Sequence, residues 1–76
     1  MSKAFVLVNT DLGSEAEVRS ELRKVEGIVG VYEVYGVYDL VVQIEAESAT
    51  KLKDIIFSKI RTLDHVRSTL TLSTVS

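Results

Sequence analysis

Hydrophobic residues in this sequence change their spacing several times, and the order of these changes limits the folds that the chain can adopt. Residues 3–10, KAFVLVNT, are apolar at nearly every position and rich in β-branched side chains. Such a run is typical of a strand that is covered on both faces. In the segment that follows, Val18, Leu22 and Val25 are spaced by three or four residues. This spacing predicts a helix with one buried stripe.

This first helix carries sequence signals for both of its ends. Ser14 followed by Glu17 matches a capping box, in which each side chain satisfies a free backbone N–H group of the first turn. Gly27 predicts that the helix stops soon after Glu26, because glycine readily adopts the left-handed conformation that ends many helices.

Two strand-like stretches flank Gly36 and predict a hairpin. Residues 29–35, VGVYEVY, precede the glycine, and apolar and polar residues alternate in 38–46, YDLVVQIEA. Ser48 is a candidate cap for a second amphipathic helix, which we expect to reach about Thr62. The apolar positions of this helix are Leu52, Ile55, Ile56, Ile60 and Leu63.

Residues 65–75, HVRSTLTLSTV, predict a closing strand. Alternation places two sets of side chains on its opposite faces. One set is Val66, Ser68, Leu70 and Leu72, and the other is Arg67, Thr69, Thr71 and Ser73.

The order strand, helix, strand, strand, helix, strand is that of the ferredoxin-like βαββαβ fold of the α+β class. In this fold two helices cover one face of a four-stranded antiparallel sheet and leave the other face open. We expect the open face to carry Val41, Gln43, Thr69, Thr71 and one side of the first strand. Because this mixture is not the charged surface of a monomer, we expect the face to be a subunit interface.

The size and composition of the chain also favour self-association. Its 76 residues predict a single domain, 1–76, and a domain of this size buries only about 60% of the surface of its unfolded chain. The sequence has no cysteine and a single histidine, so disulfides and thiolate metal sites are excluded. With 46% hydrophobic residues, the chain is expected to be stabilised by another copy of itself.

Several function classes are disfavoured. The net charge of −2 lacks the basic footprint of a nucleic-acid binder, and no apolar run approaches the length of a membrane span. The start, MSKAF, is not a signal peptide, so we expect a cytoplasmic protein. Scarce Asn, Gln and Met favour a thermophile source weakly, because the absence of proline argues the other way.

No catalytic or cofactor motif is present in the sequence. The stretch that begins at Tyr38 has no lysine or arginine where an RNA-binding relative of this fold carries an aromatic and basic motif. Phosphate-binding and nucleophile-elbow motifs are also missing. His65 beside Asp64 is interpreted as part of a turn between helix and strand. We therefore expect no enzyme activity, no cofactor and no metal.

The stretches VYEVYGVYDL, LKDIIFSKI and VRSTLTL resemble the effector-binding domain, or RAM domain, of the Lrp/AsnC (feast/famine) transcription regulators. The resemblance extends from Ala4 to about Thr74. The helix-turn-helix domain of those regulators has no counterpart here, so the chain looks like a stand-alone RAM module, and direct DNA binding is not carried over.

The resemblance implies how the chain assembles and what it binds. RAM domains pair through their sheets into dimers, and the dimers form rings, often octamers. Amino acids or similar small effectors bind between dimers, where a G-x-Y-D turn meets the final strand of a neighbour. In this sequence the turn is Gly36, Val37, Tyr38 and Asp39, and the strand contributes Thr69, Thr71 and Ser73.

These residue types suit an amino acid. Gly36 allows a ligand to approach backbone N–H groups, Asp39 can accept from an amine, and Tyr38 offers an apolar wall. A structural interpretation stays open, with Gly36 as a hairpin glycine, Asp39 as a turn former, and Thr69 and Thr71 as ordinary strand residues.

Two other functions compete with a regulatory amino-acid sensor that acts alone or with full-length regulators. One is an ACT-type allosteric subunit, since DLGSEAEV after the first strand is faintly similar to the ligand turn of that family. The other is a small ferredoxin-like enzyme, which lacks a positioned acid, base or arginine cradle in this sequence.

Overall fold

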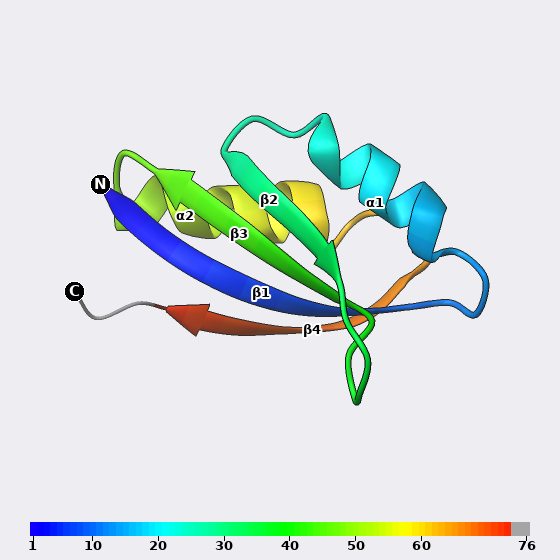
Figure 1. Cartoon of the computed structure of the whole chain (residues 1–76). Helices are drawn as coiled ribbons and strands as arrows, with labels where there is room; N and C mark the ends of the chain where they lie inside the picture. Colours follow the sequence, from blue (N-terminus) through cyan, green and yellow to red (C-terminus); the bar gives the residue numbers. More distant parts are fainter. Residues whose placement is uncertain (74–76) are drawn as a thin grey trace.

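The computed structural model describes residues 1–73, of which Ser73 is described by its backbone alone. Four strands form one antiparallel sheet in the order β2-β3-β1-β4. Both helices lie on the same side of this sheet (Figure 1), so the ferredoxin-like α+β prediction is confirmed. The elements are β1 (Ser2–Thr10), α1 (Glu15–Arg23), β2 (Ile28–Glu33), β3 (Leu40–Ala46), α2 (Ala49–Ile55), the π-helical turn η1 (Ile56–Ile60) and β4 (Val66–Ser73).

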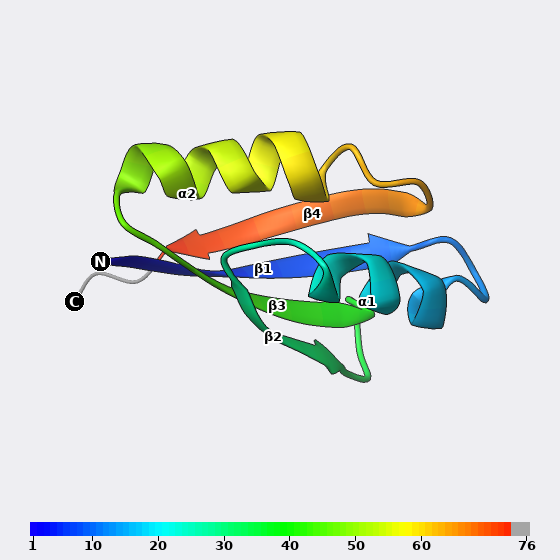
Figure 2. The same ribbon diagram turned by 90° about the horizontal axis from the view of Figure 1, so that it is seen from above.

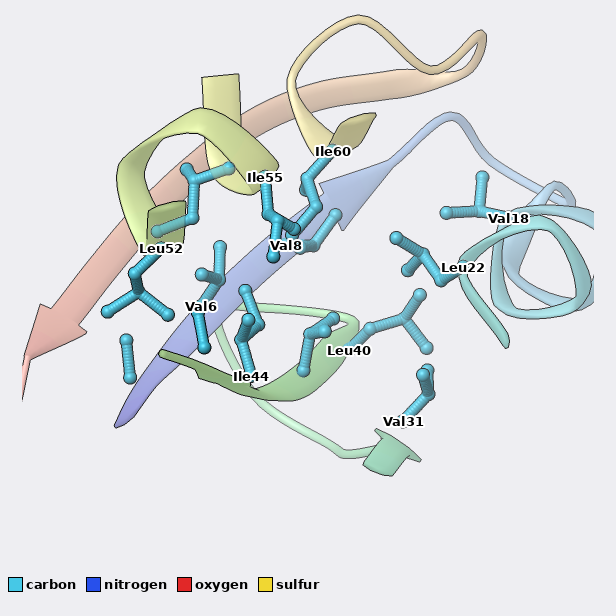
Figure 3. Close-up of a cluster of buried hydrophobic side chains, with 14 residues drawn as sticks. Val6, Val8, Val18, Leu22, Val31, Leu40, Ile44, Leu52, Ile55 and Ile60 are labelled. Carbon is cyan, nitrogen blue, oxygen red and sulfur yellow. The ribbon is translucent and has the colours of Figure 1, made fainter. Parts of the chain in front are cut away.

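Figure 2 shows the two central strands, β1 and β3, between the edge strands β4 and β2. The side chains of β1 and β3 that face the helices are buried at every second position, and they meet the apolar stripes of α1 and α2 (Figure 3). This packing confirms the predicted alternation of β3 and the predicted apolar stripes of both helices. The strands and helices contribute Ala4, Val6, Val8, Val31, Leu40, Val42, Ile44, Ala46, Val18, Leu22, Leu52, Ile55, Ile56 and Ile60.

The start of α1 differs from the predicted capping box. Ser14 lies at the N-cap, but its side chain makes no capping hydrogen bond. The reason is its backbone, which has φ −102° and ψ 5° and is outside the extended region that side-chain capping needs. The Glu17 carboxylate instead lies 3.5 Å from the Nε2 atom of His65. The helix also ends at Arg23, earlier than expected, although Gly27 has the predicted positive φ of 98°.

The second helix begins as predicted. The Ser48 side chain accepts a hydrogen bond of 3.1 Å from the backbone N–H of Lys51. The helix then widens into η1, where the N–H of Arg61 donates to the carbonyl of Ile56. Ile60, the last residue of this wider turn, is fully buried.

In the second half of β4, each side chain lies on the face of the sheet opposite to the predicted one. The strand pairs with β1 so that Leu70 is opposite Leu7, whereas Thr71 is opposite the buried Val6. Residues directly opposite one another share a face of the sheet. Thr69 and Thr71 therefore lie on the helix side, and the prediction that they lie on the open face is wrong.

A bulge explains this difference. Thr10 pairs with Val66 and Asn9 pairs with Ser68, so Arg67 is an extra residue in β4. A bulge of one residue moves all later side chains to the other face. Val66 packs against the core, and the leucines that follow do not.

The open face is consequently more apolar than expected. Phe5, Leu70 and Leu72 are 37%, 45% and 48% exposed in the isolated chain. Thus β1 is covered on one face only, whereas the sequence predicted cover on both. Tyr32 extends the patch on β2, and its ring lies over Gly30, where a Cβ atom would be 2.7 Å from the tyrosine hydroxyl oxygen. A contiguous apolar patch of this kind is typical of a protein interface.

Candidate functional site

A hollow of about 490 Å³ lies where β1 ends and β4 begins. Three parts of the chain that are distant in sequence meet there: the loop after β1, the central hairpin turn and the first residues of β4. The lining residues are Asn9, Thr10, Leu12, Glu15, Val37, Asp39, Arg67 and Ser68. The hollow thus contains Val37 and Asp39 of the seven predicted site residues.

Asp39 joins the hairpin turn to the end of β1. Its Oδ2 atom accepts hydrogen bonds from the backbone N–H and the hydroxyl of Thr10, at 2.8 and 3.3 Å. Its own backbone N–H donates to the carbonyl of Val8 at 3.0 Å. One carboxylate oxygen therefore has a structural role, as the turn-former interpretation of this residue allows. Among the described residues, no donor is hydrogen-bonded to the Oδ1 atom.

The tip of the hairpin turn projects away from the sheet (Figure 1). Gly36 has φ 128°, a backbone conformation that residues other than glycine rarely adopt. Tyr35 is fully exposed, and Val37 is 84% exposed. Gly36 and Tyr38 are not part of the hollow, although both neighbour residues that are.

The hollow within one chain does not include the predicted threonines. Thr69 is half-buried and Thr71 is exposed, and both face the helix side of β4. The side chain of Ser73 lies outside the described residues. The final strand contributes Arg67 and Ser68 in their place.

Sequence reasoning did not identify Arg67 as a site residue. It is the extra residue of the bulge, so its position does not follow from strand alternation. One feature of the sequence could have indicated Arg67 as a site residue, because it is the only basic residue among the strand-like residues 66–75. Leu12 and Glu15 were also missed as site residues, because the loop after β1 was interpreted as the start of a helix and its faint similarity to an ACT ligand turn was given less weight than the central turn.

The loop beside the hollow carries a chain of charged contacts. Arg67 lies with its Nε atom 3.9 Å from the Oδ1 atom of Asp11. The Oδ2 atom of Asp11 is 3.2 Å from the Nδ1 atom of His65, whose Nε2 atom is near Glu17. His65 has φ 71° in the turn before β4, so its predicted location in that turn is confirmed. Its ion-pair partners are these two carboxylates, whereas Asp64 is not among them.

A second hollow, of about 760 Å³, lies at the other end of the sheet between the end of α1 and α2. Val25 and Ile55 supply apolar surface, while lysines and acidic residues surround it. None of the predicted site residues is located there.

Two searches of the described residues bear on cofactors and membranes. Within residues 1–73, no group of three or more His, Asp or Glu side chains is arranged to hold a metal ion. In the same part of the chain, the helices are too short or too polar to cross a bilayer.

The sequence matches the profile of the Lrp/AsnC ligand binding domain over residues 3–76. The HTH-type transcriptional regulator FL11 of Pyrococcus abyssi is 42% identical over 53 residues, which are 70% of this chain and 35% of the regulator. The crystal structure of FFRP-DM1 superposes with a TM-score of 0.95 at 35% identity, and the match covers 99% of this chain and 100% of that one.

A transcriptional regulator of Neisseria meningitidis, NMB0573, was solved as a complex with L-Met. It is 13% identical with a TM-score of 0.85, and the match covers 99% of this chain and 50% of that one, so it shows the shared fold alone.

These comparisons show the family. The chain belongs to the Lrp/AsnC ligand-binding domains, as the resemblance implied, and its relatives include proteins named as transcription regulators. The family supports an effector-binding regulatory role. The chain spans about a third of the length of the curated relatives that it matches first.

Proposed function

We propose that the chain is an amino-acid sensor, in which the hollow beside the central turn holds the effector. The observation that carries this proposal is the chemistry collected there: one guanidinium, two carboxylates, hydroxyls and two exposed apolar side chains, in about 490 Å³. A free amino acid has the complementary groups, which are a carboxylate, an ammonium and a side chain.

Each group of an amino acid has a matching residue in the hollow. Arg67 can donate two parallel hydrogen bonds to the carboxylate of the ligand. The Oδ1 atom of Asp39, with the help of Glu15, can accept from the ammonium group. Leu12 and Val37 are 98% and 84% exposed, so they favour a ligand with an apolar side chain. The L-Met complex of the Neisseria regulator gives a precedent on the same fold.

We further propose that a neighbouring subunit completes the site. Thr71 is exposed on the edge strand β4, and Gly36 and Tyr38 lie in the projecting turn, where another subunit can reach them. Thr69 and Ser73 belong to the same proposal through their places in β4. The apolar open face supports pairing of two sheets, and such dimers would form the octameric ring that the family resemblance implies.

The proposed role is regulatory. The sensor acts in the cytoplasm on transcription or amino-acid metabolism, either as its own assembly or joined to full-length regulators through the shared interface. The match to Lrp/AsnC ligand-binding domains favours this role over an ACT-type subunit. The first turn still contributes Leu12 and Glu15 to the same hollow.

Isothermal titration with the twenty standard amino acids tests the proposal. We expect an apolar amino acid to bind, and Arg67→Gln to weaken it by about 1.5–3 kcal/mol, the range for hydrogen bonds to charged groups. Asp39→Ala should weaken binding by a similar amount. Thr10→Val removes the hydroxyl that donates to Asp39 but leaves the carboxylate in place, so it should weaken binding less than Asp39→Ala does. If no amino acid binds, or if Arg67→Gln binds as well as the wild type, the proposed site is wrong.

A further inference from the structure

A titratable side chain lies two contacts away from the proposed carboxylate-binding residue. His65 is the only histidine of the chain, and its Nδ1 atom is 3.2 Å from the Oδ2 atom of Asp11. The other oxygen of Asp11 is 3.9 Å from the Nε atom of Arg67. One carboxylate is therefore shared between a permanently charged group and a group whose charge depends on pH.

The backbone holds the His65 ring in this position. His65 has φ 71°, which is an uncommon conformation for a residue other than glycine and costs roughly 1–3 kcal/mol unless the surroundings stabilise it. The carbonyl of His65 accepts a hydrogen bond of 2.8 Å from the backbone N–H of Asp11. This bond ties the turn before β4 to the loop after β1, so that the ring and the Asp11 carboxylate stay within reach of one another.

Charged groups surround the ring on several sides. Asp11 approaches from the loop after β1, Glu17 approaches from α1 with its Oε2 atom 3.5 Å from the Nε2 atom, and Asp64 precedes His65 in the turn. Arg67 is reached through Asp11. The His65 and Glu17 side chains are 42% and 67% exposed, so solvent screens their interactions.

We propose that protonation of His65 releases Arg67 from Asp11 and thereby strengthens binding of the ligand carboxylate in the hollow. The proposal rests on the proposed function, because it concerns the regulation of that same site. When the ring is neutral, the charge of Asp11 is balanced mainly by Arg67. When the ring is protonated, it balances Asp11 and Glu17 directly, and the guanidinium is free to turn toward the hollow that it lines.

The direction of the effect follows from these charges. Histidine side chains change charge between about pH 5 and pH 8. Protonation of the ring adds a positive charge beside Asp11, which frees the Arg67 guanidinium and makes the electrostatic potential in the hollow more positive. Both consequences favour a bound carboxylate. Because the groups are half-exposed, the expected gain in affinity is about two- to fivefold, the range for interactions between exposed charges.

Titration calorimetry with L-leucine and L-methionine at about pH 7.5 and about pH 6 tests this proposal. We expect the affinity of the wild type to rise two- to fivefold at the lower pH. His65→Asn is the matched control, since asparagine tolerates positive φ and does not titrate. The affinity of this variant should stay constant over the same range, because the imidazole is gone while every other ionisable group is unchanged. Equal pH dependence in wild type and His65→Asn would overturn the proposal.

A second measurement does not need a ligand. The ¹⁵N signal of the Arg67 Nε–H group, followed by NMR in the free protein, should shift along the same pH curve as the ring signals of His65. The shift should disappear in His65→Asn and in Asp11→Asn, which removes the shared charge. An Arg67 signal that does not change with pH in the wild type would refute the coupling.

The two experiments separate the inference from the proposed function. If neither amino acid binds at either pH, the proposed function fails, and the NMR measurement still decides whether His65 controls Arg67. If an amino acid binds equally at both pH values, the sensor remains and its regulation by His65 is refuted.

Discussion

Replacing Leu70 by aspartate should separate subunits without unfolding them. Leu70 lies on the open face of the sheet, opposite Leu7, and 45% of it is exposed in the isolated chain. In a dimer that pairs two open faces, the exposed part becomes buried, together with the same residue of the other copy. Aspartate at this position would be tolerated in the monomer but would bring a carboxylate into each half of the interface.

The size of the effect can be worked from burial. Full burial of a leucine side chain is worth about 1.5–3 kcal/mol, so the 45% that is exposed contributes about 1 kcal/mol in each copy. Each buried carboxylate adds a desolvation cost of several kcal/mol. The total loss exceeds about 4 kcal/mol, which raises the dissociation constant of the dimer roughly a thousandfold.

Light scattering over a dilution series measures this dissociation, and thermal unfolding followed by circular dichroism measures the fold. Thr71→Asp is the matched control. Thr71 is the next residue of β4, is also exposed, and lies on the helix side of the sheet. We expect Leu70→Asp to give folded monomers of 8.4 kDa. Thr71→Asp leaves the open face unchanged, so it should keep the sheet-to-sheet dimer, whatever its effect on contacts between dimers. The reverse result, an unfolded Leu70→Asp and a dissociated Thr71→Asp, would refute the register of β4.

Three further results are expected. Leu22→Ala should lower the free energy of unfolding by about 2–5 kcal/mol in urea titrations, because Leu22 is fully buried and the cavity cannot close completely. Asp39→Ala should lower the free energy of unfolding by about 1–3 kcal/mol in the same titrations, because it leaves the backbone N–H of the buried Thr10 without an acceptor. Thr10→Val should lower the free energy of unfolding by less. A gel-shift assay at physiological salt should show no specific DNA binding by this chain, whose net charge is −2, and a salt-resistant complex with a promoter fragment would contradict this.

The fold could be predicted because local and global signals agree in it. The spacing of Leu52, Ile55, Ile56 and Ile60 and the cap at Ser48 define the second helix in both sequence and structure. The first helix was predicted less well. A capping box needs an extended backbone at its first residue. The sequence does not reveal that the backbone of Ser14 is not extended.

The candidate site was predictable only in part. Val37 and Asp39 were found because they belong to a turn with a recognisable sequence. Arg67 was missed because an extra residue in one strand leaves no mark on the alternation of the letters that follow it, yet it exchanges the two faces. The partners of His65 come from the loop after β1 and from α1, and contacts over such separations do not follow from local patterns.

The stacking of Tyr32 over Gly30 has a consequence for the entropy of association. A long side chain at an interface usually loses rotational freedom when the partner arrives, at a cost of about 0.5–1.5 kcal/mol. The tyrosine ring already occupies the space above the glycine, where a Cβ atom would be only 2.7 Å from its hydroxyl oxygen. Contact with the backbone of Gly30 therefore favours this placement of the ring already in the single chain. If two open faces pair as proposed, the partner sheet would meet an aromatic side chain that is already placed, which would make this end of the open face a favourable place for the first contact between subunits.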